Sequence, residues 1–281
     1  MSETSETTLS KENLRQAQKV MLYIMKKIHE VCVKHNIRYW LDYGTLLGAV
    51  RHDGFIPWDD DMDISMLRED YEKFNAIAQQ ELGEEFFWQT KETEPDFCFE
   101  MGKVRLNGTV WQEKNWEKSS ITHQGLFVDI FPIDPFPESK IQMYRLTHTA
   151  NLFNYLLFYK INKIISPRFV NKLIIWTLSP LFSKKFLKNW FTNTVKKLQK
   201  HHKNSSKISK LFDTSISNWT AKAVLDKVIL KKFEDTEFFI LQDYDTRLKQ
   251  IFGNYMQLPP EDKRYGHHGI IKIDFGKYSN L

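Results

Sequence analysis

The sequence has little cysteine and no apolar segment long enough to cross a bilayer. Its two cysteines, Cys32 and Cys98, form no CxxC pair. This composition excludes a disulfide framework and a cysteine-ligated zinc site. We therefore expect the protein to reside in a reducing compartment, the cytoplasm. The first residues, MSETSETTLSKENLRQ, lack the apolar core of a signal peptide, so we expect no targeting segment and no secretion by the standard route.

Acidic residues are absent from one long stretch of the chain. Residues 139–210 contain 15 Lys or Arg and no Asp or Glu, so this stretch carries +15. Because the whole chain carries +5, the remaining residues together carry −10. We interpret the shift as a domain boundary: residues 1–138 and 211–281 form a discontinuous catalytic domain, and residues 139–210 form a basic, mainly helical insertion.

The composition of the insertion argues against a nucleic-acid partner. Its uncharged runs, 146–159 and 173–183, have 14 and 11 residues, fewer than the roughly 20 that span a bilayer. Lysines interleaved with apolar residues suit a helix in the headgroup layer of an anionic membrane. They suit equally a helical subdomain that faces the acceptor and has a solvated lysine face. The 13 Lys against Arg145 and Arg168 disfavour nucleic acid.

Hydrophobic periodicity predicts an α/β protein of the α+β kind with a mixed sheet. Helices are expected at 10–35, where Ser10 caps the first turn, and at 46–52, 68–82 and 235–253. Strands are expected at 38–43, 59–66, 86–90, 96–106, 109–113 and 125–137. We expect residues 1–9 to be disordered and the tail from 258 to 275 to be irregular.

The segment DDDMDISM, residues 59–66, carries the strongest chemical signal. Alternation along a strand places Asp59, Asp61 and Asp63 on one face. Asp61 and Asp63 would then lie about 6–7 Å apart, which suits a hard, oxygen-ligated cation such as Mg²⁺ or Mn²⁺. Asp129 is a lone carboxylate in the apolar run 125–137. It would be a third metal ligand, a base toward an attacking hydroxyl, or a hydrogen-bonded core aspartate.

The residues before the acidic strand suit a phosphorylated substrate. Gly44-Thr45 opens a helix and offers backbone N–H groups and a hydroxyl to an anion, with Arg51 two turns further on. We assign Asp59, on the same face as the metal ligands, to substrate binding. In the tail, Arg264, His267 and His268 are further candidates for contact with phosphate.

Aromatic residues flank the same segment. Trp40, Tyr43 and Trp58 lie close to it in sequence, and aromatic faces attract quaternary ammonium groups. Core packing explains any single ring equally well. We therefore assign these three rings to substrate binding while keeping the core as the alternative.

Three blocks of the sequence resemble, in order, the signature blocks of the LicD family: RYWLDYGTLLGAVRHDGFIPWDDDMDISM, GLFVDIFPID and YDTRLKQIFGNYMQLPPEDKR. The family comprises bacterial phosphotransferases related to fukutin, within the nucleotidyltransferase-like superfamily. The likeness covers about residues 10–135 and 235–270 and does not reach the insertion. Gly253-Asn254-Tyr255 stands where the family pattern has Gly-Asp-Tyr, which removes the acid expected at that point.

The resemblance implies a nucleotidyltransferase-like core with a basic helical insertion. In it, Gly44-Thr45 is the phosphate-binding turn, Asp61 and Asp63 are the paired metal ligands, and Asp129 is the third carboxylate. It also implies a reaction in which phosphocholine, or a related phospho-alcohol, passes from a CDP-activated donor such as CDP-choline to a sugar hydroxyl. The acceptor would be a teichoic acid or another surface glycan, lipid-linked or free, and CMP would be released. We expect a cytoplasmic enzyme, in peripheral contact with the inner membrane face if the insertion binds lipid.

Two other classes of protein share some of these features. A glycosyltransferase would hold a nucleotide-sugar diphosphate with the same Asp-x-Asp metal chemistry, but the preceding Gly-Thr turn and the third carboxylate favour phosphotransfer. A non-catalytic membrane-associated protein would leave Asp61, Asp63 and Asp129 without a role.

Overall fold

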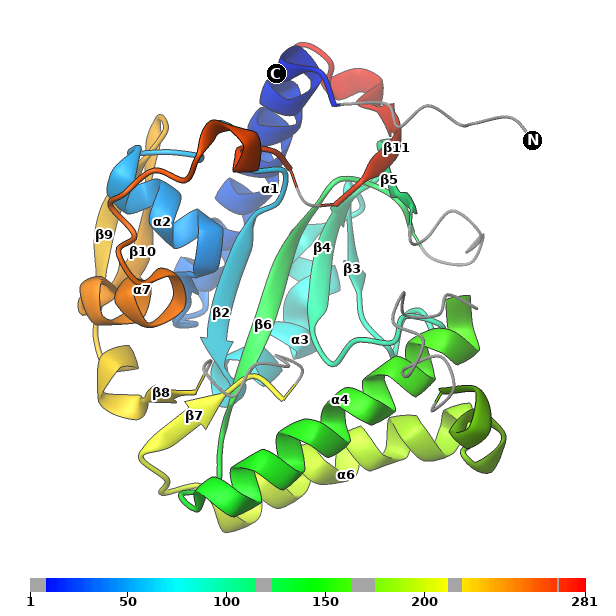
Figure 1. Ribbon diagram of the computed structural model, residues 1–281. Helices are drawn as coiled ribbons and strands as arrows, with labels where there is room; N and C mark the ends of the chain where they lie inside the picture. The colour runs from blue at the N-terminus through cyan, green and yellow to red at the C-terminus, as the bar shows by residue number, and fades with distance from the viewer. Residues whose placement is uncertain (1–8, 115–122, 163–174, 212–218, 267) are drawn as a thin grey trace.

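The computed structural model describes residues 9–114, 123–162, 175–211, 219–266 and 268–281. Over these ranges the chain is a mixed α/β protein, which confirms the predicted α/β class with a mixed sheet. A curled sheet forms the centre, and a pair of long helices lies along one side of the molecule (Figure 1). Within these ranges no helix combines the length and the hydropathy that crossing a membrane requires.

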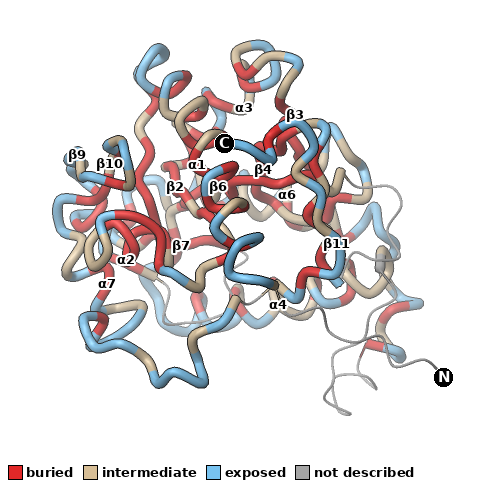
Figure 2. The backbone as a smooth tube through the Cα atoms, turned by 90° about the horizontal axis from the view of Figure 1, so that it is seen from above, coloured by how far each residue is buried: buried red, intermediate tan, exposed pale blue. Residues whose placement is uncertain are grey.

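The central sheet joins strands that are far apart in sequence. Its main path runs β1-β2-β6-β4-β3, formed by Trp40–Leu41, Asp63–Leu67, Phe127–Pro135, Gly102–Leu106 and Phe86–Gln89. β2 and β6 are parallel, whereas the other neighbours on this path are antiparallel. The last residues of β6 also pair with β7 (Lys207–Ser209), which pairs in turn with β8 (Thr220–Ala221). The central strands are buried over most of their length, and exposed residues lie mainly on loops and on the outer sides of helices (Figure 2).

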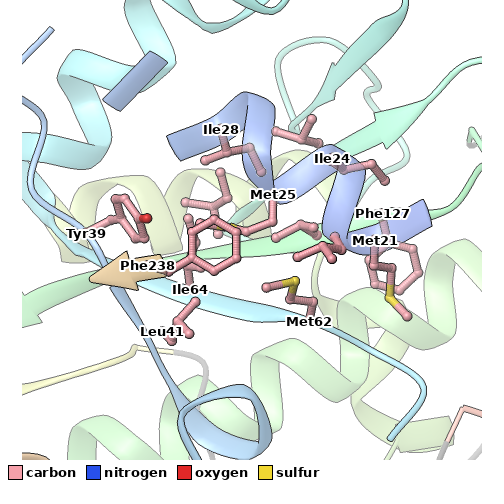
Figure 3. Packing of buried hydrophobic residues seen from close by; sticks show 14 of the residues in the cluster. Met21, Ile24, Met25, Ile28, Tyr39, Leu41, Met62, Ile64, Phe127 and Phe238 are labelled. Atoms are coloured by element: carbon pink, nitrogen blue, oxygen red, sulfur yellow. The ribbon is translucent and has the colours of Figure 1, made fainter. Parts of the chain in front are cut away.

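Helices α1 (Lys11–Lys34) and α3 (Arg68–Leu82) pack against the sheet, as the sequence predicts for 10–35 and 68–82. The Ser10 hydroxyl accepts a hydrogen bond from the Asn13 N–H at 3.1 Å and so caps α1. The apolar face of α1 meets β1, β2, β6 and β10 in the main core (Figure 3), where the labelled side chains are Met21, Ile24, Met25, Ile28, Tyr39, Leu41, Met62, Ile64, Phe127 and Phe238. Because Ile64 and Ile130 point into this core, Asp63 and Asp129, one residue before them, point to the other face.

Smaller elements surround the sheet. Next to β1 and α2 (Tyr43–Arg51) lie the hairpin strands β9 (Val228–Phe233) and β10 (Thr236–Leu241) and helix α7 (Tyr244–Phe252). Strands β5 (Val110–Glu113) and β11 (Ile270–Asp274) form a separate antiparallel pair. The short 3-10 helices are η2 (Ser179–Leu181), η4 (Lys222–Leu225), η5 (Glu261–Lys263) and η6 (Gly276–Tyr278).

The expectation of one helix over 235–253 is wrong for its first part. Phe238 and Ile240 are both buried and lie two residues apart on β10, which pairs with β9 over its full length. Their burial on one face of a strand outweighs the helical spacing of the same residues, because pairing with β9 also satisfies the backbone. The second part is helical as predicted, and Gly253 ends α7 with a φ of 65°.

In its described part, residues 139–162 and 175–210, the basic stretch forms two long helices and a helical turn at 175–178. α4 (Lys140–Asn162) and α6 (Lys184–His201) contact each other and share an apolar cluster separate from the main core, with Phe153, Leu157, Leu187 and Phe191 among its members. The end of the stretch differs from the rest, because β7 and the following Lys210 lie in the central sheet and beside it.

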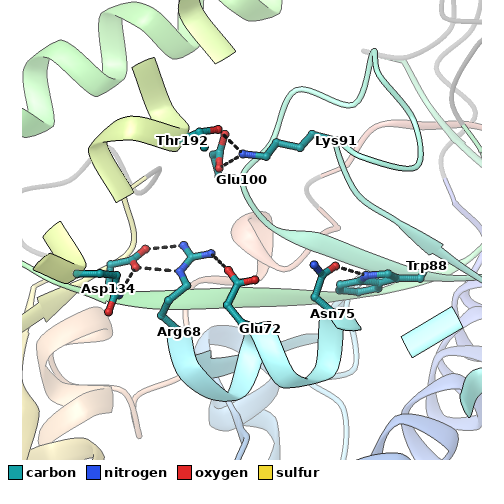
Figure 4. Close-up of polar contacts among 9 residues, drawn as sticks. Arg68, Glu72, Asn75, Trp88, Lys91, Glu100, Asp134 and Thr192 are labelled. Carbon is teal, nitrogen blue, oxygen red and sulfur yellow. Dashed lines mark hydrogen bonds and ion pairs between the residues drawn. The ribbon is translucent and has the colours of Figure 1, made fainter. Parts of the chain in front are cut away.

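Buried polar contacts fix α6 to β6 and α3 (Figure 4). Arg68, the first residue of α3, donates to both carboxylate oxygens of Asp134 on β6 at 2.9 and 2.6 Å. Gln199 of α6 donates to the same carboxylate at 2.8 Å. Nearby, Lys91 links Glu100 to Thr192 of α6. A pocket of about 250 Å³ lies between α3 and α6, but none of the predicted site residues lines it.

We predict that Asp134→Ala lowers the free energy of unfolding by about 3–5 kcal/mol, because it leaves the Arg68 guanidinium buried without its carboxylate. Urea unfolding followed by circular dichroism measures this change. Glu30→Ala is the matched control, since it breaks an exposed pair with Lys27 and is expected to cost less than about 0.5 kcal/mol. Equal losses in the two variants would contradict the role given to the Arg68–Asp134 pair.

Candidate active site

Two carboxylates face each other across the parallel strands β2 and β6. Asp63, the first residue of β2, is the register partner of Asp129 on β6. Register partners in a parallel pair direct their side chains to the same face. The backbone supports the pairing, since the Asp129 N–H donates to the Met62 carbonyl at 2.9 Å. The structure therefore brings together two of the three carboxylates that the sequence assigns to a metal.

The remaining acidic residues lie in the loop that enters β2. The predicted strand over 59–66 is wrong at its start, because residues 59–62 are irregular and β2 begins at Asp63. The loop nevertheless gathers its carboxylates: one oxygen from each of Asp59, Asp60 and Asp61 lies within 4.8 Å of the others. The cluster thus includes Asp60, to which the sequence gave no role.

Burial, followed by the charges of neighbouring acids, raises the pKa of Asp59, Asp61 and Asp63. Burial and the neighbouring charge of Asp63 raise the pKa of Asp59 to about 7. Burial, followed by the charge of Asp59, raises the pKa of Asp61 well above its usual range. The pKa of Asp63 is likewise raised by burial and then by the charges of Asp61 and Asp129. The ionised forms repel one another, and a bound cation would relieve that repulsion.

The donor set fits a divalent cation. One oxygen of Asp59, Oδ2, is buried and has no hydrogen-bond partner among the residues that the structure describes. A carboxylate oxygen in that situation is costly unless a ligand or an ion pairs with it. Gly44 leaves room for this oxygen, since a Cβ at position 44 would lie 2.6 Å from it. Carboxylate oxygens in a crowded cluster are the ligands that Mg²⁺ and Mn²⁺ prefer.

Asp129 has a partner that sequence reasoning missed. Lys103, its register partner on β4, places Nζ 2.7 Å from one carboxylate oxygen and 3.0 Å from the other. The same ammonium lies 3.6 Å from the centroid of the Phe127 ring. Asp63, Asp129 and Lys103 thus form a row across three strands. The sequence contained a signal for this partner: in GKVRL, residues 102–106, basic residues alternate with the core residues Val104 and Leu106.

The start of α2 organises the entrance to β2. Thr45 is buried, and its hydroxyl accepts a hydrogen bond from the Asp63 N–H at 2.8 Å, which anchors the first residue of the strand. Asp42 caps the helix and receives both a bidentate contact from Arg247 of α7 and a hydrogen bond from Ser65. Burial alone would raise the pKa of Asp42, but Arg247 and the nearby Lys210 hold it below its usual value. Gly44 and Thr45 therefore lie next to the acidic cluster, since Gly44 is close to Asp59 and Thr45 is hydrogen-bonded to Asp63.

Lys210 brings the end of the basic stretch to the site. Its side chain is buried, and Nζ lies 3.6 Å from the centroid of the Tyr43 ring and 3.4 Å from that of Phe131. The charge of Lys210 also opposes the rise in the pKa of Asp63. Tyr43 adopts a φ of 49°, which a non-glycine residue rarely does and which helps to place its ring there. Sequence alone gave no reason to single out Lys210 among the lysines of its stretch.

The C-terminal tail closes over the acidic loop. In the His268 ring, Nδ1 lies 3.0 Å from Asp60 Oδ1 and Nε2 lies 3.7 Å from Asp61 Oδ2. The backbone N–H of His268 also donates to Asp60 Oδ2. Burial alone would lower the pKa of His268, but the hydrogen bond with Asp60 and the charge of Asp61 raise it to about 10. The structure therefore places His268 on carboxylates, whereas the sequence assigned it to phosphate. The other tail candidate, His267, lies outside the described residues.

A cationic corner lies beside the acidic loop. Arg264 stands over the Trp58 ring, with its guanidinium carbon 5.5 Å from the ring centroid. Arg51 donates to the Tyr255 carbonyl at 2.7 Å, and its pKa is lowered by burial and by the charge of Arg264. The structure thus gathers Arg51, Trp58 and Arg264, all three of which the sequence assigned to substrate. Asn254, where the family pattern has an acid, is exposed.

Trp40 does not belong to this surface. Its side chain is fully buried in a cluster with Ile133, Ile208 and Leu241, so it cannot contact a ligand in this arrangement. The assignment of Trp40 to substrate binding is therefore wrong, and Trp40 is a core residue. The expected strand over 38–43 is also shorter, because only Trp40–Leu41 pair with β2.

The fold and the site define an α/β protein with a polyacidic centre beside a cationic corner. A family model for the LicD/FKTN/FKRP nucleotidyltransferase domain matches residues 36–155. The chain is 31% identical over 264 residues to the lipopolysaccharide cholinephosphotransferase LicD of Haemophilus influenzae, which covers 92% of this chain and 97% of that protein. A shorter alignment, 41% identical over 66 residues, relates 22% of the chain to 13% of the human ribitol 5-phosphate transferase FKRP. The chain belongs to the LicD family and is a phosphotransferase of that family.

We predict that Asp61→Asn and Asp63→Asn each lower turnover at saturating Mg²⁺ by at least about a thousandfold, because a lost metal ligand removes several kcal/mol of transition-state stabilisation. Initial rates with the active donor measure the effect, and a thermal melt shows whether the fold persists. Asp235→Asn, an exposed acid outside the site, is the control and should retain wild-type turnover. More than a tenth of wild-type activity in either site variant contradicts the assignment.

The Lys103 contact changes how Asp129 must be tested. Asp129→Asn removes a charge that Lys103 balances, so it is expected to lower stability whatever its role in catalysis. The double variant Asp129→Asn/Lys103→Met removes both charges and should recover most of the melting temperature lost in the single variant. We predict that turnover stays at least about a hundredfold below wild type in the double variant. Recovery of activity together with stability would make Asp129 a structural residue.

Proposed function

We propose that this protein transfers phosphocholine, or a related phospho-alcohol, from a CDP-activated donor to a sugar hydroxyl of a cell-surface glycan. The observation that carries the proposal is the register pairing of Asp63 with Asp129 beside the crowded carboxylates of the loop that enters β2. Two relatives are named for reactions of this kind: one is a cholinephosphotransferase and the other a ribitol 5-phosphate transferase. Nucleotidyltransferase-like architecture is part of the proposal, supported by the description of the matching family.

The proposed site would hold Mg²⁺ or Mn²⁺ through Asp61 and Asp63, with Asp59 or Asp129 as a further ligand. When bound, the ion would supply Lewis-acid stabilisation of the charge that builds on the donor diphosphate. Arg51 and Arg264 add positive charge for the same phosphates. Trp58 gives the corner an aromatic face, which suits the quaternary ammonium group of choline.

The transfer step is an in-line displacement at phosphorus. The oxygen of the acceptor hydroxyl forms a bond to the distal phosphorus while the bond from that phosphorus to the oxygen of CMP breaks. CMP leaves with the bonding electron pair, and the hydroxyl proton passes to Asp129 or to water. The ion pair with Lys103 holds the Asp129 carboxylate in place, whether it ligates the metal or accepts the proton.

The donor and the acceptor class are tested together by product analysis. We predict that incubation with Mg²⁺ and a glycan acceptor releases CMP from CDP-choline, CDP-glycerol or CDP-ribitol and leaves UDP-sugars intact. Chromatography of the nucleotide products measures this, and the Asp63→Asn variant is the control for contaminating hydrolases. Release of UDP from a UDP-sugar, with no CMP from any CDP-alcohol, would assign the chain to the glycosyltransferase alternative.

A further inference from the structure

The three most exposed apolar side chains of the described residues all belong to the basic stretch 139–210. Leu181 is 70% exposed, and Trp176 and Ile141 are each 68% exposed. Trp176 and Leu181 lie in the short segment that precedes α6, and Phe186, 47% exposed, lies in the first turn of α6. We call Trp176, Leu181 and Phe186 the apolar tip.

One residue of the apolar tip, Phe186, packs on an aromatic cluster. Phe186 stacks on Phe182 with ring centroids 5.3 Å apart and an angle of 28° between planes. Phe153 of α4 contacts Phe182 at 5.2 Å and Trp190 of α6 at 4.9 Å. These rings join α4 to α6 and pack against Phe186, so that part of the tip has a packed aromatic support. Figure 1 shows α4 and α6 along the outer side of the molecule.

The charge around the tip selects its partner. Lys184 and Lys185 stand between Leu181 and Phe186, and both are exposed; Lys184 is paired with Asp96 at 3.2 Å, whereas Lys185 adds its charge to the surface. Further along α6, Lys196, Lys197 and Lys200 are exposed as well, in a stretch that contains no acidic residue. A second copy of this chain would bring like charges together, whereas an anionic lipid surface attracts them.

We propose that the apolar tip inserts into the headgroup layer of an anionic membrane, with the lysines of α6 against the lipid phosphates. Trp, Leu and Phe flanked by lysines are the residues that bind at such an interface, and the absence of a spanning helix among the described residues accords with binding to one leaflet. Docking would hold the catalytic domain at the surface where a lipid-linked glycan is presented. The inference goes beyond the proposed function, because membrane binding is measured without donor or acceptor.

The test is co-sedimentation of the full chain with vesicles of phosphatidylcholine containing about one third phosphatidylglycerol, and with pure phosphatidylcholine vesicles. We expect binding to the anionic vesicles at about 50 mM salt, release at about 500 mM, and little binding to the neutral vesicles. Trp176→Ser/Leu181→Ser should lower the partition coefficient at least about tenfold, because it removes two inserting side chains. Lys185→Gln/Lys197→Gln should lower it several-fold and flatten the salt dependence.

Val33→Ser/Leu230→Ser is the matched control, since these side chains are 55% and 50% exposed on the catalytic body. It should bind like the wild type, and thermal melts should show all variants folded. No binding to anionic vesicles at low salt overturns the proposal, as does equal loss in the tip variant and the control. A dimer in sedimentation velocity that the tip variant abolishes, with no vesicle binding, would instead assign the tip to self-association. Activity on a water-soluble acceptor, measured separately, is expected to be unchanged in the tip variant.

Discussion

The parallel pairing of β2 with β6 is the constraint on which the site depends. It aligns Asp63 with Asp129, and the antiparallel pairing of β4 with β6 then adds Lys103 to the same row. The apolar neighbours of these residues point to the opposite face, where α1 and α3 cover them. One strand arrangement therefore satisfies two demands at once: a dry core on one face and a concentration of charge on the other. A slip of one residue in this register would bury the acids and expose the core.

Concentrating carboxylates is unfavourable, and the surrounding structure contains several compensations. Lys103 balances Asp129, Arg247 balances Asp42, and His268 lies between Asp60 and Asp61. Asp59, Asp61 and Asp63 are left with raised pKa values, which marks the place where the protein leaves charge uncompensated. Uncompensated electrostatic repulsion of this kind is typical of a site that receives a ligand, because the ligand supplies the missing interaction.

Local sequence patterns predicted much of this arrangement. Periodicity gave α1 and α3 with nearly their true bounds, and the isolated acid in an apolar run identified Asp129 as a residue that needs a partner. Predictions were wrong where tertiary pairing decides: the chain over 236–241 is a strand because β9 lies beside it, and Asp59 and Asp61 lie in a loop because β2 pairs only from Asp63. The sequence alone gave no reason to single out Lys210 or Arg247. Their importance comes from strands and helices that meet only in the folded chain.

We propose that the acids at the start of β2, together with Asp129, form one divalent-cation site. Titration of Mn²⁺ followed by electron paramagnetic resonance tests it directly, because the signal of the free ion falls as the ion binds. We expect saturable Mn²⁺ binding to the wild type that Mg²⁺ displaces, and a loss of affinity of at least about tenfold in Asp63→Asn. Equal Mn²⁺ affinity in the wild type and in Asp63→Asn, with both proteins folded, would contradict it.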